Sequence, residues 1–221
     1  MQKKKLLLII PVFLFGTVVK CQTSFSFSSD LNAQRNIKKD QKFWAIGADL
    51  VSIVHFTPRN GAYFSFSYFA NGRFVNRLNA TAKSPATIPQ QVNYNDTSRI
   101  RFKQISIGFR KFLVGRNDIE KGGNLYLNAG FGLVLGRVFN SFSISPDTTL
   151  YNLPVLSGKA NFKRLTVDLG LGYERPLTGD IYIYSEAKVW IPTTDYPSKY
   201  LYVNQDAPFL LMLCAGMRIL F

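Results

Sequence analysis

Apolar and polar residues alternate along most of the chain with a period of two. Residues 125–135 are the clearest case, because every odd position is apolar and the even positions include Tyr126, Asn128 and Gly130. Successive side chains of a β-strand point to opposite faces, so this pattern predicts strands with one apolar and one polar face. The same alternation, with weaker copies, predicts eight strands, near residues 24–33, 44–56, 62–70, 104–110, 125–136, 165–174, 181–191 and 209–221.

The connections between these strands alternate in length. Segments 57–60, 114–122 and 176–180 are short or compact and rich in turn-forming residues, whereas segments 79–97, 140–161 and 192–207 are long, polar and contain proline. Short turns at one end and long loops at the other are typical of outer-membrane barrels. The fold predicted is therefore all-β, an eight-stranded antiparallel transmembrane β-barrel with up-and-down meander topology. An even number of strands places both termini at the short-turn, periplasmic end.

The polar face of the strands decides between a membrane barrel and a soluble one. A membrane barrel is apolar towards lipid and polar inside, whereas a soluble lipocalin-like barrel would show a continuous apolar face to water. Many glycines lie on the polar face, and they would make room for large inward side chains. The inward polar and charged residues expected are Asp49, Arg110, Tyr126, Asp168, Glu174, Glu186, Lys188 and Arg218.

The interior of such a barrel can form a salt-bridged plug or a narrow pore. Eight strands enclose little more than their own side chains, which favours the plug. Buried charges must pair. A regular hairpin around Thr178 would place Asp168 opposite Lys188.

The first 21 residues have the features of a secretory signal peptide. Three lysines at 3–5 precede an apolar stretch at 6–15, and small residues precede a cleavage point before Gln22. An N-terminal anchor helix is the alternative, but ten apolar residues are too few to span a membrane. A lipoprotein modified at Cys21 is a further alternative, which Lys20 fits poorly. The prediction is a cleaved segment 1–21 and one barrel domain at 22–221.

The composition limits the metal sites and the charged surfaces that the chain can form. The chain has one His and two Cys, which argues against a zinc site built from these residues, and we predict no metal and no cofactor. The formal net charge is +14. On the predicted topology most of this charge lies at the rim near the long loops, at Arg35, Lys38, Lys39, Lys42, Arg73, Arg77, Arg99, Arg101, Lys103, Arg137, Lys163 and Arg164.

A basic ring at this position has two interpretations. It could bind lipopolysaccharide phosphates through charge-assisted hydrogen bonds, or its long side chains could simply extend to the interface. A nucleic-acid partner is not expected, because the ring would lie at the cell surface and no binding module is visible.

The C-terminus carries a more specific signal. The chain ends at Phe221, and apolar residues including Ile219 and Met217 occupy every second position before it. This resembles the assembly signal of bacterial outer-membrane β-barrel proteins, and with the eight-strand pattern the chain resembles the small OmpX/OmpA-type barrels. The resemblance implies residence in the outer membrane of a Gram-negative bacterium. The partners it implies are the barrel-assembly machinery, outer-membrane lipids and lipopolysaccharide. Members of this class are anchors, adhesion or defence proteins, narrow pores and lipid-modifying enzymes.

Three functions remain in view. The first is a non-enzymatic barrel that stabilises the lipopolysaccharide leaflet or presents its long loops to an unknown surface or complex partner. The second is a narrow pore for ions or small solutes. The third is a lipid A-modifying enzyme, which would need a histidine and a serine near the outer leaflet. The one histidine, His55, falls at the short-turn end and points inward, and Ser52 lies on the opposite face, so we predict no catalytic residue.

Overall fold

A computed structural model describes residues 24–36, 42–193 and 209–221. The strands are β1 (Ser24–Asn36), β2 (Phe43–Thr57), β3 (Asn60–Ala82), β4 (Gln91–Val114), β5 (Asn124–Phe142), β6 (Tyr151–Asn152), β7 (Gly158–Thr178), β8 (Ile181–Pro192) and β9 (Leu210–Leu220). The predicted signal peptide, the rim residues Lys38 and Lys39 and most of segment 192–207 lie outside the described residues. Among the described residues no helix has the length and apolar character needed to cross a membrane.

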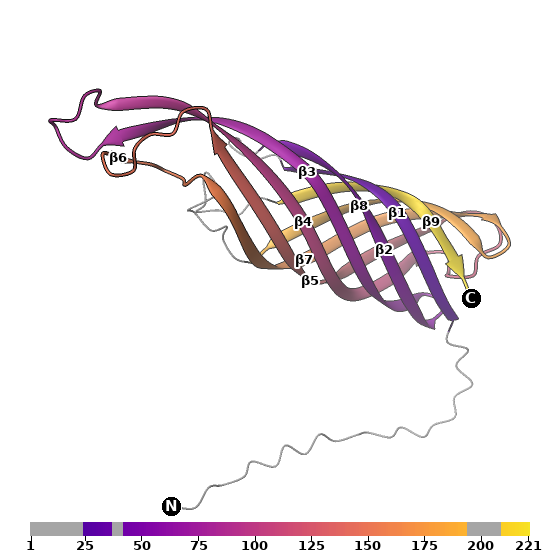
Figure 1. The fold of residues 1–221 in the computed structure, drawn as a ribbon. Helices are drawn as coiled ribbons and strands as arrows, with labels where there is room; N and C mark the ends of the chain where they lie inside the picture. Colours follow the sequence, from indigo (N-terminus) through magenta and orange to yellow (C-terminus); the bar gives the residue numbers. More distant parts are fainter. Residues whose placement is uncertain (1–23, 37–41, 194–208) are drawn as a thin grey trace, which may run out of the picture.

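Eight strands close into an antiparallel ring, as the sequence predicts. Each ring strand pairs with its neighbours in chain order, and β1 closes the ring by pairing with both β2 and β9. The ninth strand, β6, is outside the ring and pairs with the end of β3. Both described ends lie at the short-turn end of the barrel, where the backbones of Phe25 and Phe221 hydrogen-bond to each other (Figure 1).

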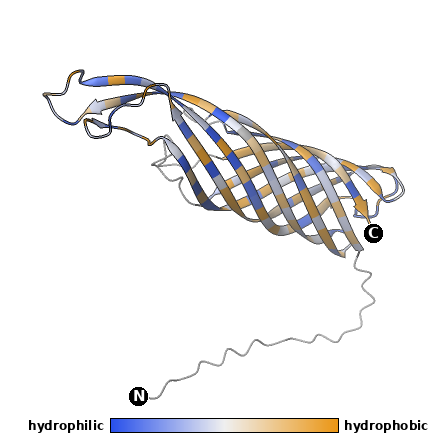
Figure 2. Ribbon diagram, in the orientation of Figure 1, coloured by the Kyte–Doolittle hydropathy of each residue, from blue (hydrophilic) through white to orange (hydrophobic). Residues whose placement is uncertain are grey.

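The burial pattern is inside out. Outward residues such as Ile46, Phe131 and Leu213 are 75%, 70% and 67% exposed, whereas inward residues such as Asp49 and Arg218 are buried. Figure 2 shows the resulting mixture of hydrophobic and hydrophilic positions along every strand. This distribution suits a ring surrounded by lipid.

The apolar outer band approaches the height of about 25 Å that is typical of outer-membrane barrels. On β4 the outward residues between Lys103 and Lys111 are Ile105, Ile107 and Phe109. Eight residues span about 26 Å along a strand, or about 20 Å along the barrel axis at the usual tilt. The two lysines therefore mark the edges of the membrane-spanning part of this strand.

Four strands continue beyond this band as a projecting sheet. The β3–β4 ladder runs on to the pair Thr81–Gln91, whereas β2 ends its pairing opposite Ala70 and β8 ends opposite Thr166. β5 continues beside β4 and β7 continues beside β5, so the sheet consists of the distal parts of β3, β4, β5 and β7 (Figure 1). We use the name projecting sheet for this unit.

The expectation of a long loop at 79–97 is therefore wrong. Only residues 83–90 connect β3 to β4. The polar residues there are strand residues, and the apolar ones between them pack together. Segment 140–161 is likewise partly strand, and residues between β5 and β7 cover this packing. The cluster consists of Leu78, Ala80, Tyr94, Tyr151 and Val155.

One bulge and the position of one turn explain where alternation and the expected register fail. An irregularity between Phe69 and Gly72 reverses the alternation of β3, so Phe66 before it faces outward whereas Phe74, also at an even position, is buried inside. The β7–β8 hairpin turns at Gly179 and Asp180, because Thr178 pairs with Ile181, and not around Thr178. Asp168 consequently lies opposite Trp190 and not opposite Lys188.

Inward glycines leave space for large side chains, as the polar-face pattern suggests. A Cβ atom on Gly172 would lie 2.2 Å from Cζ of Tyr126, and one on Gly136 would lie 2.0 Å from the ring of Phe162. Both rings are inside the barrel, so the glycines on one strand set the positions that aromatic rings from another strand can occupy.

We predict that Gly172→Val lowers barrel stability by about 1–3 kcal/mol, because the new side chain would collide with a fully enclosed ring. The urea unfolding midpoint in detergent micelles measures this effect. Ala215→Val on β9 adds similar volume on the outer face and should change the midpoint little. Equal midpoints for the two variants would show that the ring of Tyr126 is not tightly held.

Candidate functional site

The short-turn end of the interior is closed by a buried ion pair. Arg218 donates from Nη2 and Nε to the two carboxylate oxygens of Glu174, at 2.7 and 3.0 Å, and both side chains are fully buried. The guanidinium also lies 4.0 Å from the ring centroid of Tyr182. A bidentate arginine–carboxylate pair with an aromatic face beside it is a strong and geometrically fixed contact.

The β4–β5 turn folds across this end. Arg218 donates to the backbone carbonyl of Asn117 at 2.8 Å, and the Asn117 side chain donates to Ser24 Oγ at 2.7 Å. The Asn117 backbone N–H donates to the carbonyl of Pro58 in the β2–β3 turn. Residues from four separate parts of the chain therefore meet at this mouth of the barrel.

The middle of the interior is crossed by bonds between distant strands. Glu186 on β8 accepts hydrogen bonds from Tyr126 and Asn128 on β5 at 2.9 and 2.8 Å, and lies 3.6 Å from Arg110 on β4. Lys188 on β8 contacts Asp49 on β2 at 3.0 Å. These contacts join strands that are two or three places apart in the ring, so side chains occupy the lumen at this level.

Asp168 is held by neutral donors. Gln104, Ser106 and Thr166 all donate hydrogen bonds to its carboxylate. A cavity of about 20 Å³ remains between Asp168, Lys188 and their neighbours. That volume is about what one water molecule needs.

All eight sequence-predicted interior residues thus lie inside the ring, but they pair differently from the expectation. Lys188 contacts Asp49 on β2 and not Asp168 on β7, and Arg110 lies beside Glu186. The pairings follow from the register and the curvature of the closed sheet, which alternation along one strand does not encode.

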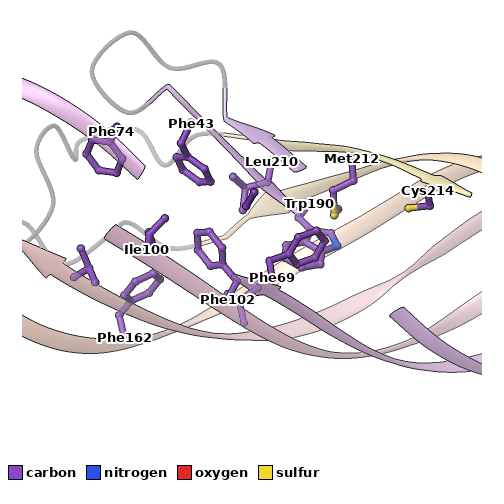
Figure 3. Close-up of a cluster of buried hydrophobic side chains, with 13 residues drawn as sticks. Phe43, Phe69, Phe74, Ile100, Phe102, Phe162, Trp190, Leu210, Met212 and Cys214 are labelled. Atoms are coloured by element: carbon purple, nitrogen blue, oxygen red, sulfur yellow. The ribbon is translucent and has the colours of Figure 1, made fainter. Parts of the chain in front are cut away.

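An apolar cluster fills the interior next to the projecting sheet (Figure 3). Phe43 lies between Phe74 and Phe102 with centroid distances of 6.1 and 6.0 Å, and Phe69 meets Trp190 edge to face at 5.4 Å. We call it the aromatic plug; its members are Phe43, Ala45, Phe69, Phe74, Ile100, Phe102, Val134, Val138, Phe162, Trp190, Leu210, Met212 and Cys214.

Sequence analysis missed the aromatic plug. The available signal was the presence of Phe69, Phe102 and Trp190 on a strand face that is otherwise polar. The residues come from seven strands, and Phe74 joins them only because of the bulge in β3.

The basic rim is concentrated on one half of the circumference. Arg35, Lys42 and the rim residues of β3, β4 and β5 are exposed, as is Lys163 on β7. The expectation for Arg164 is wrong: it directly follows Lys163 on a strand, so it points inward, and it is only 4% exposed. It lines a small internal cavity of about 10 Å³ with Phe102 and Trp190.

Seven of the exposed cations form three neighbouring rows across β3, β4, β5 and β7. We call this group the basic face; it consists of Arg73, Arg99 and Lys159, then Arg101 and Arg137, then Lys103 and Lys163. Lys159 was not anticipated from the sequence. In the described part of the chain none of the seven forms a salt bridge with an acidic side chain.

His55 is a buried interior residue near the β2–β3 turn. Its Nε2 hydrogen-bonds to Ser26 Oγ, its ring stacks on Phe112, and both His55 and Ser26 are at most 1% exposed. Ser26 is the serine that sequence reasoning overlooked. Its hydroxyl also accepts a hydrogen bond from Arg218, and no described residue is a hydrogen-bond partner of His55 Nδ1 that would orient the ring as a general base.

One interior group has metal-ligand chemistry. A carboxylate oxygen of Asp30, one of Asp49 and the sulfur of Cys214 lie within 4.8 Å of one another. Tyr184 and Asn32 donate to Asp30, and Lys188 supplies positive charge to Asp49. Hydrogen-bond donors and a cation of the protein itself therefore already bind these two carboxylates.

The projecting sheet contains a titratable group above the membrane. Asp96 lies seven residues beyond Lys103 on β4 and is fully buried. Burial raises the pKa of Asp96 to about 6, against the opposing effect of a hydrogen bond from Ser98. Asp96 lies opposite Asn76 on β3.

The inside-out ring of eight strands and its filled lumen define the fold of a small bacterial outer-membrane β-barrel protein. No family model matches the sequence, and no curated protein matches it. The fold is similar to that of Neisserial surface protein A, with a TM-score of 0.52 and 11% identity over 88% of this chain and 96% of that one. It is also similar to OprG from Pseudomonas aeruginosa, with a TM-score of 0.50 and 11% identity over 90% and 96%.

A further solved structure is Ail of Yersinia pestis in complex with the heparin analogue sucrose octasulfate, at a TM-score of 0.49 and 13% identity over 90% of this chain and 99% of that one. At these identities the likeness concerns the fold alone.

We predict that Glu174→Gln destabilises the barrel by about 3–5 kcal/mol, because it leaves the fully buried Arg218 without its counter-charge. The urea unfolding midpoint in micelles is the measurement. Arg116→Ala is the matched control, since it breaks an ion pair of similar length (2.9 Å) whose partners are 60% and 48% exposed. That variant should change stability by less than about 1 kcal/mol. Equal effects would mean that water reaches the Arg218 site.

Proposed function

We propose that the protein is a closed, non-enzymatic outer-membrane barrel that presents the projecting sheet at the cell surface to a partner and orders the lipopolysaccharide leaflet with its basic rim. The observation that carries the proposal is the filling of the lumen. Direct bonds cross the middle of the ring, and the aromatic plug occupies its other end.

The projecting sheet gives the closed barrel a structured surface in addition to its membrane-spanning part. Its ordered turn at 83–90 and the covering segment around β6 form a structured surface rather than a set of separate loops. Lys83 donates to the carbonyl of Thr148 at 2.7 Å, and the Tyr151 hydroxyl donates to the carbonyl of Pro89 at 2.9 Å. Two connections that are distant in sequence are thereby held together at the tip.

The chemistry of the interior supports a structural role. The Ser26–His55 pair lies at the short-turn end, opposite the basic rim, and is enclosed by Arg218 and Phe112. A lipid A-modifying site would need a nucleophile and base that face the outer leaflet. The pair instead belongs to the polar filling of the barrel.

Closure of the lumen predicts that the folded, detergent-purified protein produces no discrete conductance steps in a planar bilayer. Lys188→Ala should leave the bilayer silent and should lower only the stability of the barrel, because Lys188 contacts Asp49 across the lumen. Steady wild-type steps whose size changes in Lys188→Ala would contradict the proposal and favour a narrow pore.

Placement of the projecting sheet outside the cell predicts a labelling contrast. Ala86→Cys at the exposed tip should react with an impermeant maleimide on intact cells, whereas Asp180→Cys in the exposed β7–β8 turn should react only after the outer membrane is permeabilised. The native Cys214 is buried and should stay unlabelled in the folded wild type. The reverse pattern would place the sheet in the periplasm and would defeat the proposed surface role.

A further inference from the structure

The basic face carries like charges in direct opposition. Arg73 lies opposite Arg99 across the β3–β4 ladder, and Arg101 lies opposite Arg137 across the β4–β5 ladder. Like charges at directly opposed positions of a sheet destabilise it. Anions bound between the arginines would remove this repulsion.

Two hollows of the outer surface lie among these cations. The first has a volume of about 500 Å³ and is lined by Arg73, Arg99, Arg101, Arg137 and Lys159 with Ile100 and Phe139. The second has a volume of about 420 Å³, and its lining includes Tyr68, Lys103 and Lys163. Arg101 and Arg137 line both hollows. The arrangement suits two anionic groups side by side, with the same two guanidinium groups between them.

An apolar groove continues from the basic face toward the short-turn end on the same strands. Its volume is about 640 Å³. Small residues such as Ala62 and Ala129 lie between the side chains of Phe64, Phe109 and Phe131. The lining is apolar apart from Ser52 and Tyr63, which suits a hydrocarbon chain.

The register shows that hollow and groove are aligned. Lys103, Leu135 and Lys163 occupy one row across the sheet, and the row that contains Ile107 and Phe131 lies four residues further along each strand. Four residues correspond to about 13 Å along the strand. The row between them is entirely apolar; it consists of Phe66, Ile105, Leu133 and Leu165.

Among the described residues, the opposite half of the barrel has fewer outward cations. The outward residues of β9 are apolar from Leu211 to Ile219, and the described outward cations at this rim on β1 and before β2 are Arg35 and Lys42. Arg35 stacks over Trp44 at 4.8 Å. Within the described part of the ring, directly opposed pairs of arginines are thus a feature of β3, β4 and β5, and simple extension of side chains to the interface would not require such pairs.

We propose that the face formed by β3, β4, β5 and β7 binds one acylated lipid that carries two phosphate groups, the chemistry of lipid A. The phosphates lie in the two hollows on either side of Arg101 and Arg137, which bind them with charge-assisted hydrogen bonds. One acyl chain lies in the groove between Phe64, Phe109 and Phe131. The inference rests on the proposed function, because it requires the basic face to meet the outer leaflet.

The headgroup half of the site is tested by charge reversal. Binding of diphosphorylated lipid A to the folded protein in zwitterionic detergent micelles is measured by titration for wild type, for Arg101→Glu/Arg137→Glu and for Arg35→Glu/Lys42→Glu. The two double variants carry the same change in net charge. We expect at least about a tenfold loss of affinity for the first and less than about a twofold loss for the second. Equal losses of affinity in the two double variants would refute the proposed site, because they would show that lipid A is attracted only by the net positive charge of the barrel.

The acyl half is tested by filling the groove. Ala129→Trp should weaken binding of diphosphorylated lipid A by about tenfold and leave binding of its fully deacylated diphosphorylated disaccharide unchanged. Ala187→Trp, on the outer face of β8, is the matched control and should affect neither ligand. If wild type binds the disaccharide as tightly as the lipid, the site is one for soluble phosphate and the lipid proposal is wrong.

A sulfated polysaccharide is the competing occupant of the basic face. Heparin that binds more tightly than lipid A, and equally well to Ala129→Trp and wild type, would overturn the lipid assignment. Each variant is first checked for folding by its heat-dependent mobility on a denaturing gel. These binding measurements depend on neither conductance nor orientation in cells. If the test variants and their controls bind lipid A equally well, while the barrel does not conduct and its tip is labelled on intact cells, only this inference is refuted. If the test variants lose affinity as expected but the barrel conducts, only the closed-barrel function is refuted.

Discussion

Polar atoms enclosed by a ring of eight strands must find their hydrogen-bond partners inside that ring. Neither the surrounding lipid nor bulk water can satisfy them, and an isolated charge there is very costly. In this protein bonds that cross the lumen meet much of this requirement. Arg218 with Glu174, Lys188 with Asp49, and Glu186 with Tyr126 and Asn128 each join separate strands. The closure of the barrel follows from this constraint, because each satisfied pair also occupies the space that a solute would need.

The same constraint separates the functional surfaces from the interior. With the lumen filled by ion pairs at one end and by the aromatic plug at the other, the exposed chemistry lies on the outer wall and on the projecting sheet. The outer wall is apolar over the membrane band, and its charge is concentrated on the basic face. On the proposed function, the barrel acts through the projecting sheet that it carries and through the lipid beside it.

Period-two alternation was sufficient to predict the ring, its inside-out character and the inward position of residues such as Tyr126 and Arg218. Alternation along a strand determines on which side of the sheet each side chain lies, and this is a local property of the strand. Pairing across the lumen depends on register, and the position of the β7–β8 turn at Gly179 and Asp180 places Asp168 opposite Trp190 and away from Lys188. The bulge in β3 brings Phe74 into the interior, which alternation alone does not indicate.

The projecting sheet was mistaken for loops because its strands carry polar residues on both faces, away from lipid. Arg164 shows the opposite failure, in which residue type suggested the rim although alternation with Lys163 indicated the interior. Both errors arose from weighting composition above strand geometry. The basic face itself was partly visible in the sequence, but its concentration on four strands emerges only when the ring is closed.

The length of the projecting sheet sets the distance between the membrane surface and a partner that binds the tip. From Lys103 at the membrane edge to Gln91 at the start of β4 there are twelve residues, or about 40 Å of extended chain. The strands of the other half of the ring have no comparable extension in the described chain, with β2 ending its pairing opposite Ala70. The barrel is therefore taller on the side of the projecting sheet than on the other side. A partner that engages the tip approaches from a defined direction and touches the protein well above the headgroups, out of reach of the lipids that hold its base.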